Sequence, residues 1–486
     1  MLVGSRVDEA VVDAPLERLL GRYSMPRTSD SAHPLRRAGQ LLTDRFRCPE
    51  KVADFVIRGD LSHDAGYFRL GSDVCYGQCS SGAPLKSVTE SLHDARGHVV
   101  TNGSSVQLPF DPVQVVDNLR CERYLGYSTG GERRLPANRV LRNLYYVMRP
   151  IMPVSVRKHF QRLYFRGWNK TPFPTWPVDR TVENIFEQLL VLSMKSQKVK
   201  DVPFIWFWPE GARSCAILTH DVETSAGLDF CPQLMDLTDS FGIKGSFQIV
   251  PEKRYPVPEL LLQTIRKRGF EINVHDLNHD GQLFSDRKQF WRRAERINRY
   301  ARQFGALGFR SAVMYRNIDW YDALDLSYDM SIPNVAHLDP QQGGCCTVLP
   351  FFIGNILELP VTTTQDYSIF YVLNDYSIRL WQKQISLIRE KHGLMNFVIH
   401  PDYIIDEAAR RVYAELLHYL SELRSQRETW IALPSEVAAW WRLRSELNLV
   451  NVGNSWHIEG KGSERARVAH AVLANDTLTY ELDRRC

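Results

Sequence analysis

Short apolar runs alternate with helical patterns through the second half of the chain. Between several runs, apolar residues recur three and four positions apart, as they do along an amphipathic helix. The predicted strands are Ala216–Leu218, Ser246–Val250, Phe270–Val274, Leu307–Phe309, Tyr328–Ile332, Ile356–Leu359, Phe397–Ile399 and Trp430–Leu433. The predicted helices include Glu259–Arg268, Arg287–Gln303, Ile378–Lys391 and Glu407–Leu423. Because strands that alternate with helices run parallel, and this many repeats favour closure, the pattern predicts an α/β fold with a (β/α) barrel.

The rest of the chain divides into segments of different character. Residues 1–40 are rich in Arg, Ser and Pro without periodicity, which predicts a flexible arm. Residues 41–130 show short strands and turns, typical of a small α+β module of unknown role. A basic helical connector is predicted over 131–212, the barrel over 213–442, and a β-hairpin tail over 443–486.

Composition indicates a globular protein of more than one domain. The chain has 486 residues, of which 44% are hydrophobic and 24% charged. Its nine cysteines lack the spacing of a disulfide framework, which favours a reducing compartment. The first twenty residues contain acids and no apolar segment, and no stretch reaches the ~18 apolar residues of a membrane span. We therefore expect a cytoplasmic protein without a signal peptide.

The segment Arg133–Lys170 is strongly basic, with ten Lys or Arg, no Asp or Glu, and interleaved aromatic residues. Its simplest interpretation is a connecting helix with a solvated basic face. A peripheral contact with anionic lipid at the inner face of the membrane is the second interpretation. Nucleic-acid binding is the weakest, because no nucleic-acid-binding motif accompanies the charge, and we expect no nucleic-acid partner.

Ionisable residues follow the first predicted strand directly. The apolar run 216–218 leads into His220, Asp221 and Glu223. Asp221 and Glu223 are two positions apart, so on an extended strand end they point the same way. Two neighbouring carboxylates repel each other unless a cation lies beside them. This pair therefore predicts a cation near the strand end.

Three further predicted strands also end in residues suited to metal or proton chemistry. His275 and His279 are four apart, so on a helical turn both imidazoles can reach one ion. With one carboxylate they form a two-His, one-carboxylate ligand set, which leaves coordination positions of the ion open for water and substrate. Arg310 follows another strand and can clamp a carboxylate and lower its pKa. His400 alone is most simply a histidine bonded to backbone, but the conjunction of four such strand ends predicts a metal site.

These motifs resemble those of the polysaccharide deacetylase family, the carbohydrate esterases that include chitin and peptidoglycan deacetylases. The segment Thr219-His-Asp-Val-Glu223 resembles the family's Thr-Phe-Asp-Asp motif in its Asp-Val-Asp/Glu variant. The segments around His275, Arg310 and His400 resemble its His-x-x-x-His, arginine and Leu-His motifs. The likeness covers about residues 214–441 and does not reach the first 130 residues.

The resemblance implies a distorted (β/α) barrel that holds a divalent metal ion, Zn²⁺ first, with Co²⁺, Mn²⁺ or Ni²⁺ as alternatives. In the variant motif the second acid binds the metal, which implies Glu223, His275 and His279 as ligands. Asp221 is the less favoured carboxylate ligand.

The resemblance also implies the proton-transfer residues of a deacetylase. Asp221 would act as the base, and Arg310 would orient it. His400 would protonate the departing amine. The expected activity is the hydrolysis of N-acetyl groups on an amino-sugar glycan or glycan precursor.

The sequence departs from the family pattern at three places. His220 replaces the usual Phe and could perturb Asp221 or serve as an additional ligand. Ser311-Ala312 replace the prolines that usually follow the arginine. The acid that usually steadies the arginine has only Asp366 as a candidate.

Substrate contacts are predicted from the loops that follow strands. Trp320, Tyr321, His337 and Tyr403 could stack on or bond to a sugar, and each is equally compatible with a structural role. A cytoplasmic enzyme cannot easily meet finished cell-wall polymer. We therefore expect a lipid- or nucleotide-linked sugar precursor in exopolysaccharide, capsule or envelope glycan synthesis.

Two other functions fit the same sequence. The first is another amidohydrolase reaction on a C–N bond, with a cyclic ureide or imide as substrate. The second is a non-catalytic role, in which the barrel is a glycan-binding scaffold and the N-terminal module is the working part.

Overall fold

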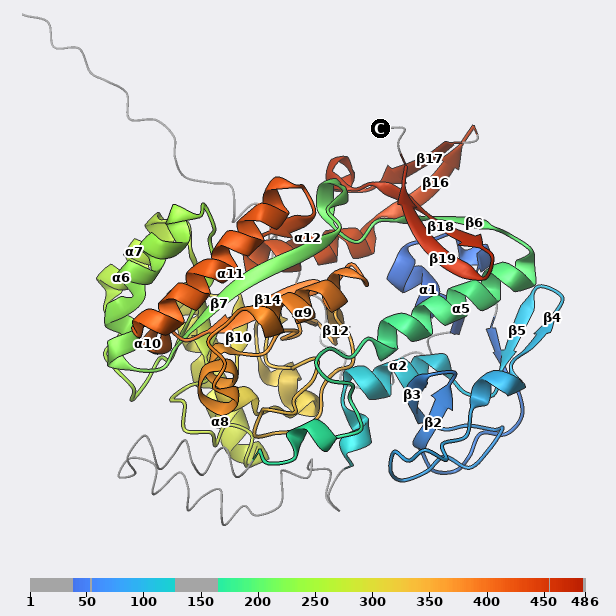
Figure 1. Cartoon of the computed structure of the whole chain (residues 1–486), viewed down its shortest axis with the longest axis horizontal. Coiled ribbons are helices and arrows are strands. Elements are labelled where there is room, and N and C mark those ends of the chain that lie inside the picture. The colour runs from blue at the N-terminus through green and yellow to red at the C-terminus, as the bar shows by residue number, and fades with distance from the viewer. Residues whose placement is uncertain (1–37, 53–54, 127–164, 454, 484–486) are drawn as a thin grey trace, which may run out of the picture. The chain divides into compact units, whose positions relative to one another are not determined.

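The computed structural model describes residues 38–52, 55–126, 165–453 and 455–483, all within one compact unit that begins at Arg37 (Figure 1). The predicted arm, residues 1–40, lies almost wholly outside the described residues, and so does most of the basic segment 133–170. The predictions made for these two segments therefore stay predictions.

A curled sheet organises the second half of the chain. Its strands are β7 (Ser214–Val222), β8 (Ser246–Ile249), β9 (Glu271–His275), β10 (Gly308–Arg310), β11 (Tyr328–Asp329), β12 (Phe351–Ile353), β13 (Ile356–Glu358), β14 (Leu394–Ile399) and β15 (Thr429–Ile431). The strand order is β12-β13-β11-β10-β9-β8-β7-β14, with β15 also paired to β7. Neighbouring strands are parallel except β12 and β13. The predicted α/β fold with a distorted barrel is therefore confirmed, and β12 is the strand that the sequence pattern did not predict.

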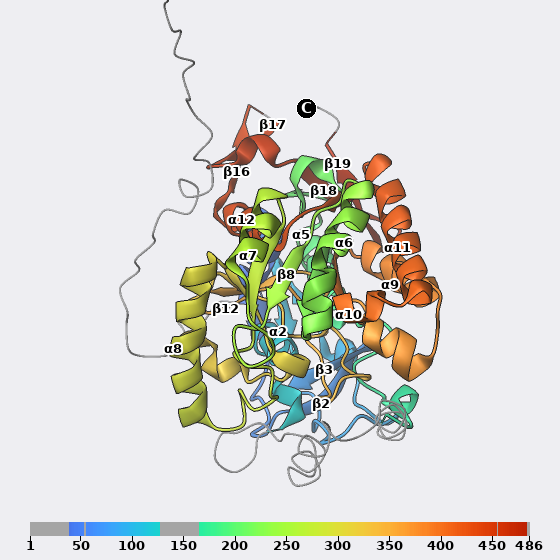
Figure 2. The same cartoon turned by 90° about the vertical axis from the view of Figure 1, so that its left-hand side faces the viewer.

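Helices lie outside this sheet, as Figures 1 and 2 show. They are α6 (Ser225–Ser240), α7 (Glu259–Lys267), α8 (Arg287–Phe304), α9 (Arg379–Arg389), α10 (Pro401–Ile404), α11 (Glu407–Ser425) and α12 (Pro434–Glu446). Short 3-10 turns also occur here, η6 (Ala312–Met314) and η7 (Ile318–Ala323), together with η8 (Ser368–Leu373), which is a π-helical turn. The four helices named from the sequence agree to within one or two residues at each end.

The helix α8 shows how local sequence sets these elements. Its N-cap is Asp286, whose side chain accepts a hydrogen bond from the Gln289 backbone N–H at 2.8 Å. Its C-terminal cap is Gly305, with φ of 57°. Buried residues recur every three or four positions, at Phe290, Ala294, Ile297, Ala301 and Phe304. This spacing gives one apolar face that packs on the sheet.

The strand β7 is buried on both faces, and its side chains alternate between two apolar cores. Ala216 and Leu218 belong to the core that includes the outer helices. Cys215 and Ile217 belong to a second core, on the opposite face. Because side chains alternate along a strand, Thr219 and Asp221 continue the second face and His220 the first. Thr219 and Asp221 can therefore contact the same neighbours, whereas His220 points to the opposite side of the sheet.

The N-terminal part of the described chain adds its own small sheets and helices. They are α1 (Ala38–Phe46), η1 (Glu50–Val52), β1 (Phe55–Ile57), β2 (Gly66–Leu70), β3 (Asp73–Gly77), η2 (Ala95–His98), β4 (Val100–Asn102), β5 (Ser105–Leu108), α2 (Pro112–Arg120) and η3 (Arg123–Leu125). The segment that links it to β7 contains η4 (Trp168–Lys170), α5 (Thr181–Gln197), β6 (Asp201–Ile205) and η5 (Pro209–Gly211). Apolar residues of α1, α2, α5 and β6 share the second core with β7. The predicted domain boundaries therefore fall inside a continuous core and stay predictions.

A buried ion pair joins this N-terminal part to the loop after β10. Glu122 accepts hydrogen bonds from the Arg316 guanidinium, at 2.7 Å from Nε, and both side chains are fully buried. Glu122 also accepts the Gly344 backbone N–H at 2.7 Å, and Tyr124 donates its hydroxyl to the Gly344 carbonyl at 2.6 Å. Burial of an ion pair is tolerated when its remaining groups are bonded, as they are here. The N-terminal part is thus bonded to two loops of the barrel, the loop that carries Arg316 and the loop that carries Gly344.

Two hairpins follow α12, where the sequence predicts a β-hairpin tail. The strands β16 (Asn448–Val452) and β17 (Ser455–Glu459) form the first. The second consists of β18 (Val468–Ala474) and β19 (Thr477–Leu482), with a 3-10 turn, η9 (Ser463–Arg465), before it. Because β18 also pairs antiparallel with β6, the tail is part of the sheet that leads into the barrel. In the described part of the chain, every helix is too short or too polar to cross a membrane.

Candidate metal centre

Three ligand-type side chains converge where β7 and β9 end. One ligand atom each from Glu223, His275 and His279 lies within 4.8 Å of the other two. The Glu223 Oε1 atom is 2.9 Å from His279 Nε2 and 3.8 Å from His275 Nε2. Two atoms that each lie about 2.1 Å from a tetrahedral ion are about 3.4 Å apart. The three side chains are therefore spaced as ligands of one ion would be.

The sheet register brings these residues together. The pairing of β8 with β7 and with β9 aligns their carboxyl ends, where Asp221 and His275 lie. His279 follows in an irregular loop rather than on the helical turn expected from the sequence, because Asp276 and His279 both have φ of 54°. The loop is held by the Asp276 backbone N–H, which donates to the Arg310 carbonyl at 2.8 Å. The two imidazoles still converge, with ring centroids 4.8 Å apart.

The state of His275 fits metal binding. Its Nδ1 lies 3.1 Å from the Arg310 carbonyl oxygen, which can only accept a hydrogen bond. In the neutral imidazole the proton therefore resides on Nδ1, and the lone pair of Nε2 faces Glu223. This Nε2 atom is buried and makes no hydrogen bond within the described residues. A buried acceptor without a donor costs free energy, and a cation at this point removes that cost.

The charges around the site are strongly coupled. Burial would raise the pKa of Glu223, but the facing imidazoles, His279 first and then His275 and His400, hold that pKa well below its usual range. Burial would lower the pKa of His275, but Asp221 and Glu223 raise it instead. A divalent ion bound among these groups would supply positive charge beside both carboxylates.

Asp221 lies beside this site and is held by Arg310. The Arg310 Nη1 atom donates to Asp221 Oδ1 at 3.1 Å and to Thr219 Oγ1 at 2.8 Å, and Arg310 Nε donates to the Met330 carbonyl at 3.0 Å. The other carboxylate oxygen of Asp221 is 3.8 Å from His275 Nε2. One oxygen is therefore engaged by the guanidinium while the other faces the candidate ion site. This arrangement supports Glu223 as the carboxylate ligand.

His400 lies on another side of Glu223 and is held by Asp366. The His400 Nδ1 atom is 2.6 Å from Asp366 Oδ1, and the His400 backbone N–H donates to Asp366 Oδ2 at 2.8 Å. Its Nε2 atom is 3.4 Å from Glu223 Oε1. Burial alone would lower the pKa of His400, but Asp366 raises it well above its usual range. Asp366 therefore orients His400, and the sequence-based suggestion that it steadies Arg310 was wrong.

His220 does not take part in the candidate site. Its Nδ1 atom bonds to the Ser246 carbonyl at 3.1 Å, and its Nε2 atom bonds to the Tyr413 hydroxyl at 2.9 Å. Burial lowers its pKa to about 4, so this imidazole is neutral. The side-chain alternation of β7 points His220 to the opposite face from Asp221. Its suggested role as an additional ligand was wrong.

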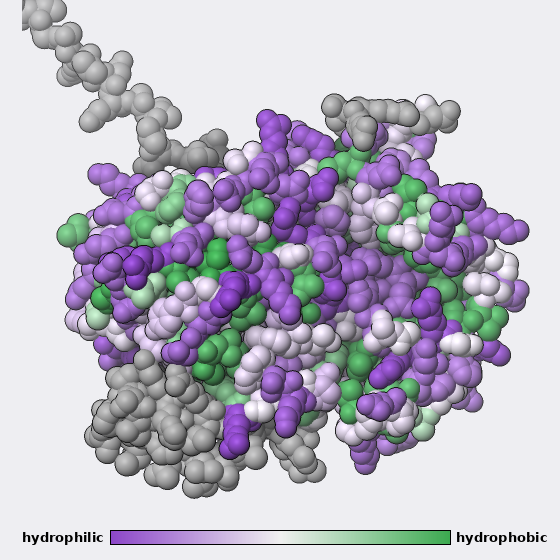
Figure 3. All heavy atoms as spheres, viewed as in Figure 1, coloured by the Kyte–Doolittle hydropathy of each residue, from purple (hydrophilic) through white to green (hydrophobic). Residues whose placement is uncertain are grey.

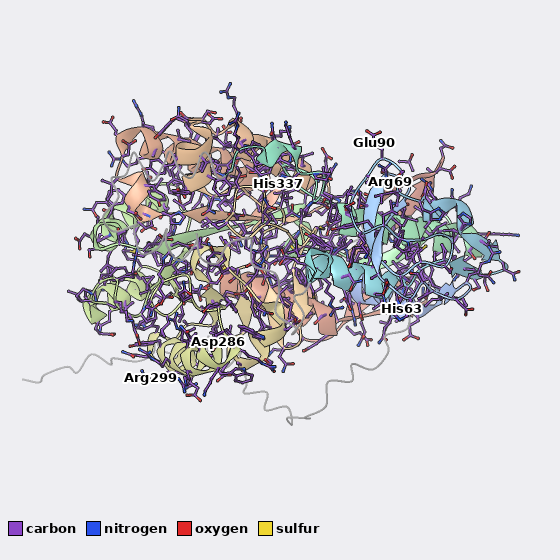
Figure 4. All side chains as sticks on the ribbon, turned by 90° about the horizontal axis from the view of Figure 1, so that it is seen from below. His63, Arg69, Glu90, Asp286, Arg299 and His337 are labelled. Carbon is purple, nitrogen blue, oxygen red and sulfur yellow. The ribbon has the colours of Figure 1, made fainter. Side chains whose placement is uncertain are left out.

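The four substrate candidates from the sequence occupy different environments. Tyr403 is half-buried, with its ring 5.0 Å from that of His400. Trp320 and Tyr321 belong to the apolar core, where Trp320 packs 5.4 Å from Phe290, so neither can contact a sugar. His337 is buried against Trp176, with ring centroids 5.8 Å apart, and Figure 4 shows it well apart from α8, the helix of Arg299. A ring contact with a residue of the candidate site is observed for Tyr403, through His400.

Sequence comparisons find neither a matching family model nor a matching curated protein. Solved structures of similar fold include a protein described as a polysaccharide deacetylase from Mycobacterium smegmatis, at 18% identity and a TM-score of 0.42, over 51% of this chain and 96% of that one. The allantoinase Puue matches at 14% identity and a TM-score of 0.40, over 48% and 92%. The peptidoglycan deacetylase PdaC from Bacillus subtilis matches at 11% identity and 0.31, over 47% and 93%. Structures described as polysaccharide or peptidoglycan deacetylases are thus among those that align with about half of this chain.

Proposed function

We propose that this protein is a metal-dependent hydrolase that removes the acetyl group from an N-acetylated sugar of a glycan or glycan precursor. One observation carries the proposal. Two histidines and one carboxylate that could hold an ion lie between an acid held by an arginine, Asp221, and a histidine held by an acid, His400. Amide hydrolysis needs a proton acceptor for the attacking water and a proton donor for the departing nitrogen, and these two residues can supply both.

Glu223, His275 and His279 would hold the ion. When bound there, a divalent ion lowers the pKa of water and polarises the amide carbonyl. Two imidazoles and one carboxylate suit Zn²⁺, with Co²⁺, Mn²⁺ and Ni²⁺ as alternatives.

Asp221 accepts the proton of the attacking water in this proposal. The oxygen that faces the ion site takes the proton, because Arg310 Nη1 engages the other oxygen. Arg310 also fixes the orientation of Asp221, and its own orientation is set by Thr219 and the Met330 carbonyl. A base held in this way needs no rearrangement before it accepts the proton.

His400 donates a proton from Nε2 to the departing amine nitrogen. Asp366 accepts the Nδ1–H, which directs Nε2 toward the site and keeps the imidazole protonated to higher pH. Acetate and a free amino sugar are then the products. The same geometry accommodates the hydrolysis of other C–N bonds, such as those of cyclic ureides and imides.

Acetate release is the experiment that tests this proposal. We expect acetate from N-acetylhexosamine oligomers or from lipid- or nucleotide-linked N-acetylhexosamines, loss of activity after chelation, and recovery on addition of Zn²⁺ or Co²⁺. Cyclic ureides and imides are assayed in parallel. Ring opening without acetate release would favour the other amidohydrolase reaction, and activity that survives complete metal removal would contradict the proposed mechanism.

A further inference from the structure

An arginine that the proposed mechanism does not use is anchored on a residue of the candidate ion site. Arg254 donates its Nε–H to the backbone carbonyl of Glu223 at 2.8 Å. Its side chain is half-buried and forms no ion pair within the described residues. The Nη1 and Nη2 atoms of Arg254 likewise have no hydrogen-bond partner in that part of the chain, and we call these two atoms the free edge.

The loop between β8 and α7 holds Arg254 in place (Figure 2). The Glu252 backbone N–H donates at 3.0 Å to the carbonyl of Leu277, which lies between the two candidate histidine ligands, and the Arg254 backbone N–H donates to the Glu252 carbonyl at 2.9 Å. Lys253 between them has φ of 66°. The side chain of Glu252 is engaged by Arg296. The nearest acid along the chain is therefore paired with another arginine.

A guanidinium in this position differs from an ordinary surface charge. Charged residues are common on the surface, as the purple areas of Figure 3 show, and most of them are simply solvated. Arg254 is instead half-buried, and its bond to the Glu223 carbonyl uses one of the five donors of the guanidinium. The two Nη atoms present parallel donors that match the two oxygens of a phosphate or a carboxylate. An oxyanion is thus the ligand that complements the free edge.

We propose that the free edge of Arg254 binds an anionic group of the substrate, a phosphate or a carboxylate. Lys253, the preceding residue, is exposed, and its positive charge favours the approach of an anion. The substrate is then a charged N-acetylated sugar, such as a phosphate-linked precursor or a uronic acid, in preference to a neutral chain. That the anion belongs to a deacetylase substrate rests on the proposed function, whereas the binding of an anion at Arg254 does not.

Binding is measured by calorimetry on the metal-loaded Asp221→Asn protein, with an N-acetylhexosamine, its 1-phosphate and an N-acetylhexosaminuronic acid. We expect one of the two anionic sugars to bind at least about tenfold more tightly than the neutral sugar at low salt, and the difference to shrink as ionic strength rises. The preferred anionic sugar identifies the source of the charge, phosphate or carboxylate.

The Arg254→Gln variant, in the same background, assigns this preference to the arginine. A phosphate can also bind the ion itself, so the comparison with this variant is decisive. Affinity for the preferred anionic sugar should fall about ten- to hundredfold, as expected for the loss of a charge-assisted pair of hydrogen bonds. Affinity for the neutral sugar should fall by no more than about twofold.

Tyr255 provides a matched control for a purely structural role. Its hydroxyl donates to the Val222 carbonyl at 2.5 Å and accepts the Val250 backbone N–H at 3.1 Å, so it fastens the same end of β7 as Arg254 does. Tyr255→Phe removes this contact without a change of charge and should leave the preference for the anionic sugar intact. Arg287→Gln removes an exposed charge from α8 and should change neither affinity.

Two further measurements keep the proposal testable if Arg254→Gln disturbs the ion site. Metal content is determined on every preparation, and one ion per chain is expected in each. Arg254→Lys keeps the charge but lacks the paired donors, so its preference for the anionic sugar should lie between those of the native residue and Gln. In the otherwise native enzyme, Arg254→Gln should raise KM for the charged substrate about tenfold more than KM for the neutral one.

The possible results distinguish the two proposals. A preference for an anionic sugar that is lost in Arg254→Gln and kept in Tyr255→Phe supports the subsite, even if no acetate is released; in that case the proposed function fails alone. Equal affinity for charged and neutral sugars, or a preference that survives in Arg254→Gln, would overturn the subsite. Equal losses for both kinds of sugar in Arg254→Gln would also overturn it, because they indicate a structural role. If acetate is then still released, the proposed function stands without the subsite.

Discussion

The Asp221→Asn variant is expected to release acetate about a thousandfold more slowly than the native protein while it binds the same amount of metal. The asparagine has nearly the same shape and can still bond to Arg310, but it cannot take a proton at neutral pH. Metal binding should persist because Glu223, His275 and His279 are unchanged. Steady-state acetate release and metal content, measured on the same preparation, check this expectation.

The control for this variant is Asp229→Asn, which makes the same change at an exposed position on α6. It should leave both rate and metal content unchanged. A loss of metal in Asp221→Asn would instead identify Asp221 as a ligand. Near-native activity with metal in place would show that another group takes the proton.

Replacement of His400 by a residue that cannot donate a proton is expected to reduce the rate of acetate release to a similar degree. The His400→Gln variant keeps a side chain of comparable length that cannot act as an acid at neutral pH, and its rate should fall about 10² to 10⁴-fold. The Asp366→Asn variant tests whether the protonation of His400 by way of Asp366 governs the rate. Because Asp366 raises the pKa of His400, its neutralisation should lower that pKa.

The direction of the pH effect follows from the role of His400. An acid is active while protonated, so activity is present below its pKa and is lost as the pH rises through it. In Asp366→Asn the alkaline limb of the kcat profile should therefore move to lower pH, with metal content unchanged. An unmoved alkaline limb would assign that limb to another group and remove His400 from the role of acid.

The apolar pattern of the sequence predicts most strands and helices of the barrel, together with the four strand ends that carry the candidate site residues. Strands such as β7 and β14 are recognisable because both faces are buried, which leaves a continuous apolar run before the polar residues. His275, Arg310 and His400 each follow such a run directly. Their convergence could therefore be predicted from the rule that parallel strands place their carboxyl ends on one side of the sheet.

The residues that the sequence could not place lie outside regular elements or depend on long-range contacts. Asp366 follows β13 in an irregular segment and meets His400 34 positions later, so no local pattern marks the pair. Trp320 looks like a loop aromatic, but the 3-10 turn η7 folds it into the core against Phe290. The role of Glu122 was hidden for the same reason, because its partner Arg316 is 194 positions away.

Metal stoichiometry tests the central claim most directly. Purified protein, stripped and reloaded with Zn²⁺ or Co²⁺, is analysed by elemental mass spectrometry beside Glu223→Gln, His279→Ala and His220→Phe. One ion per chain is expected in the native protein and in His220→Phe, with loss of the ion in Glu223→Gln and His279→Ala. A native chain that binds no ion, or a full complement of metal in both ligand variants, would contradict the account.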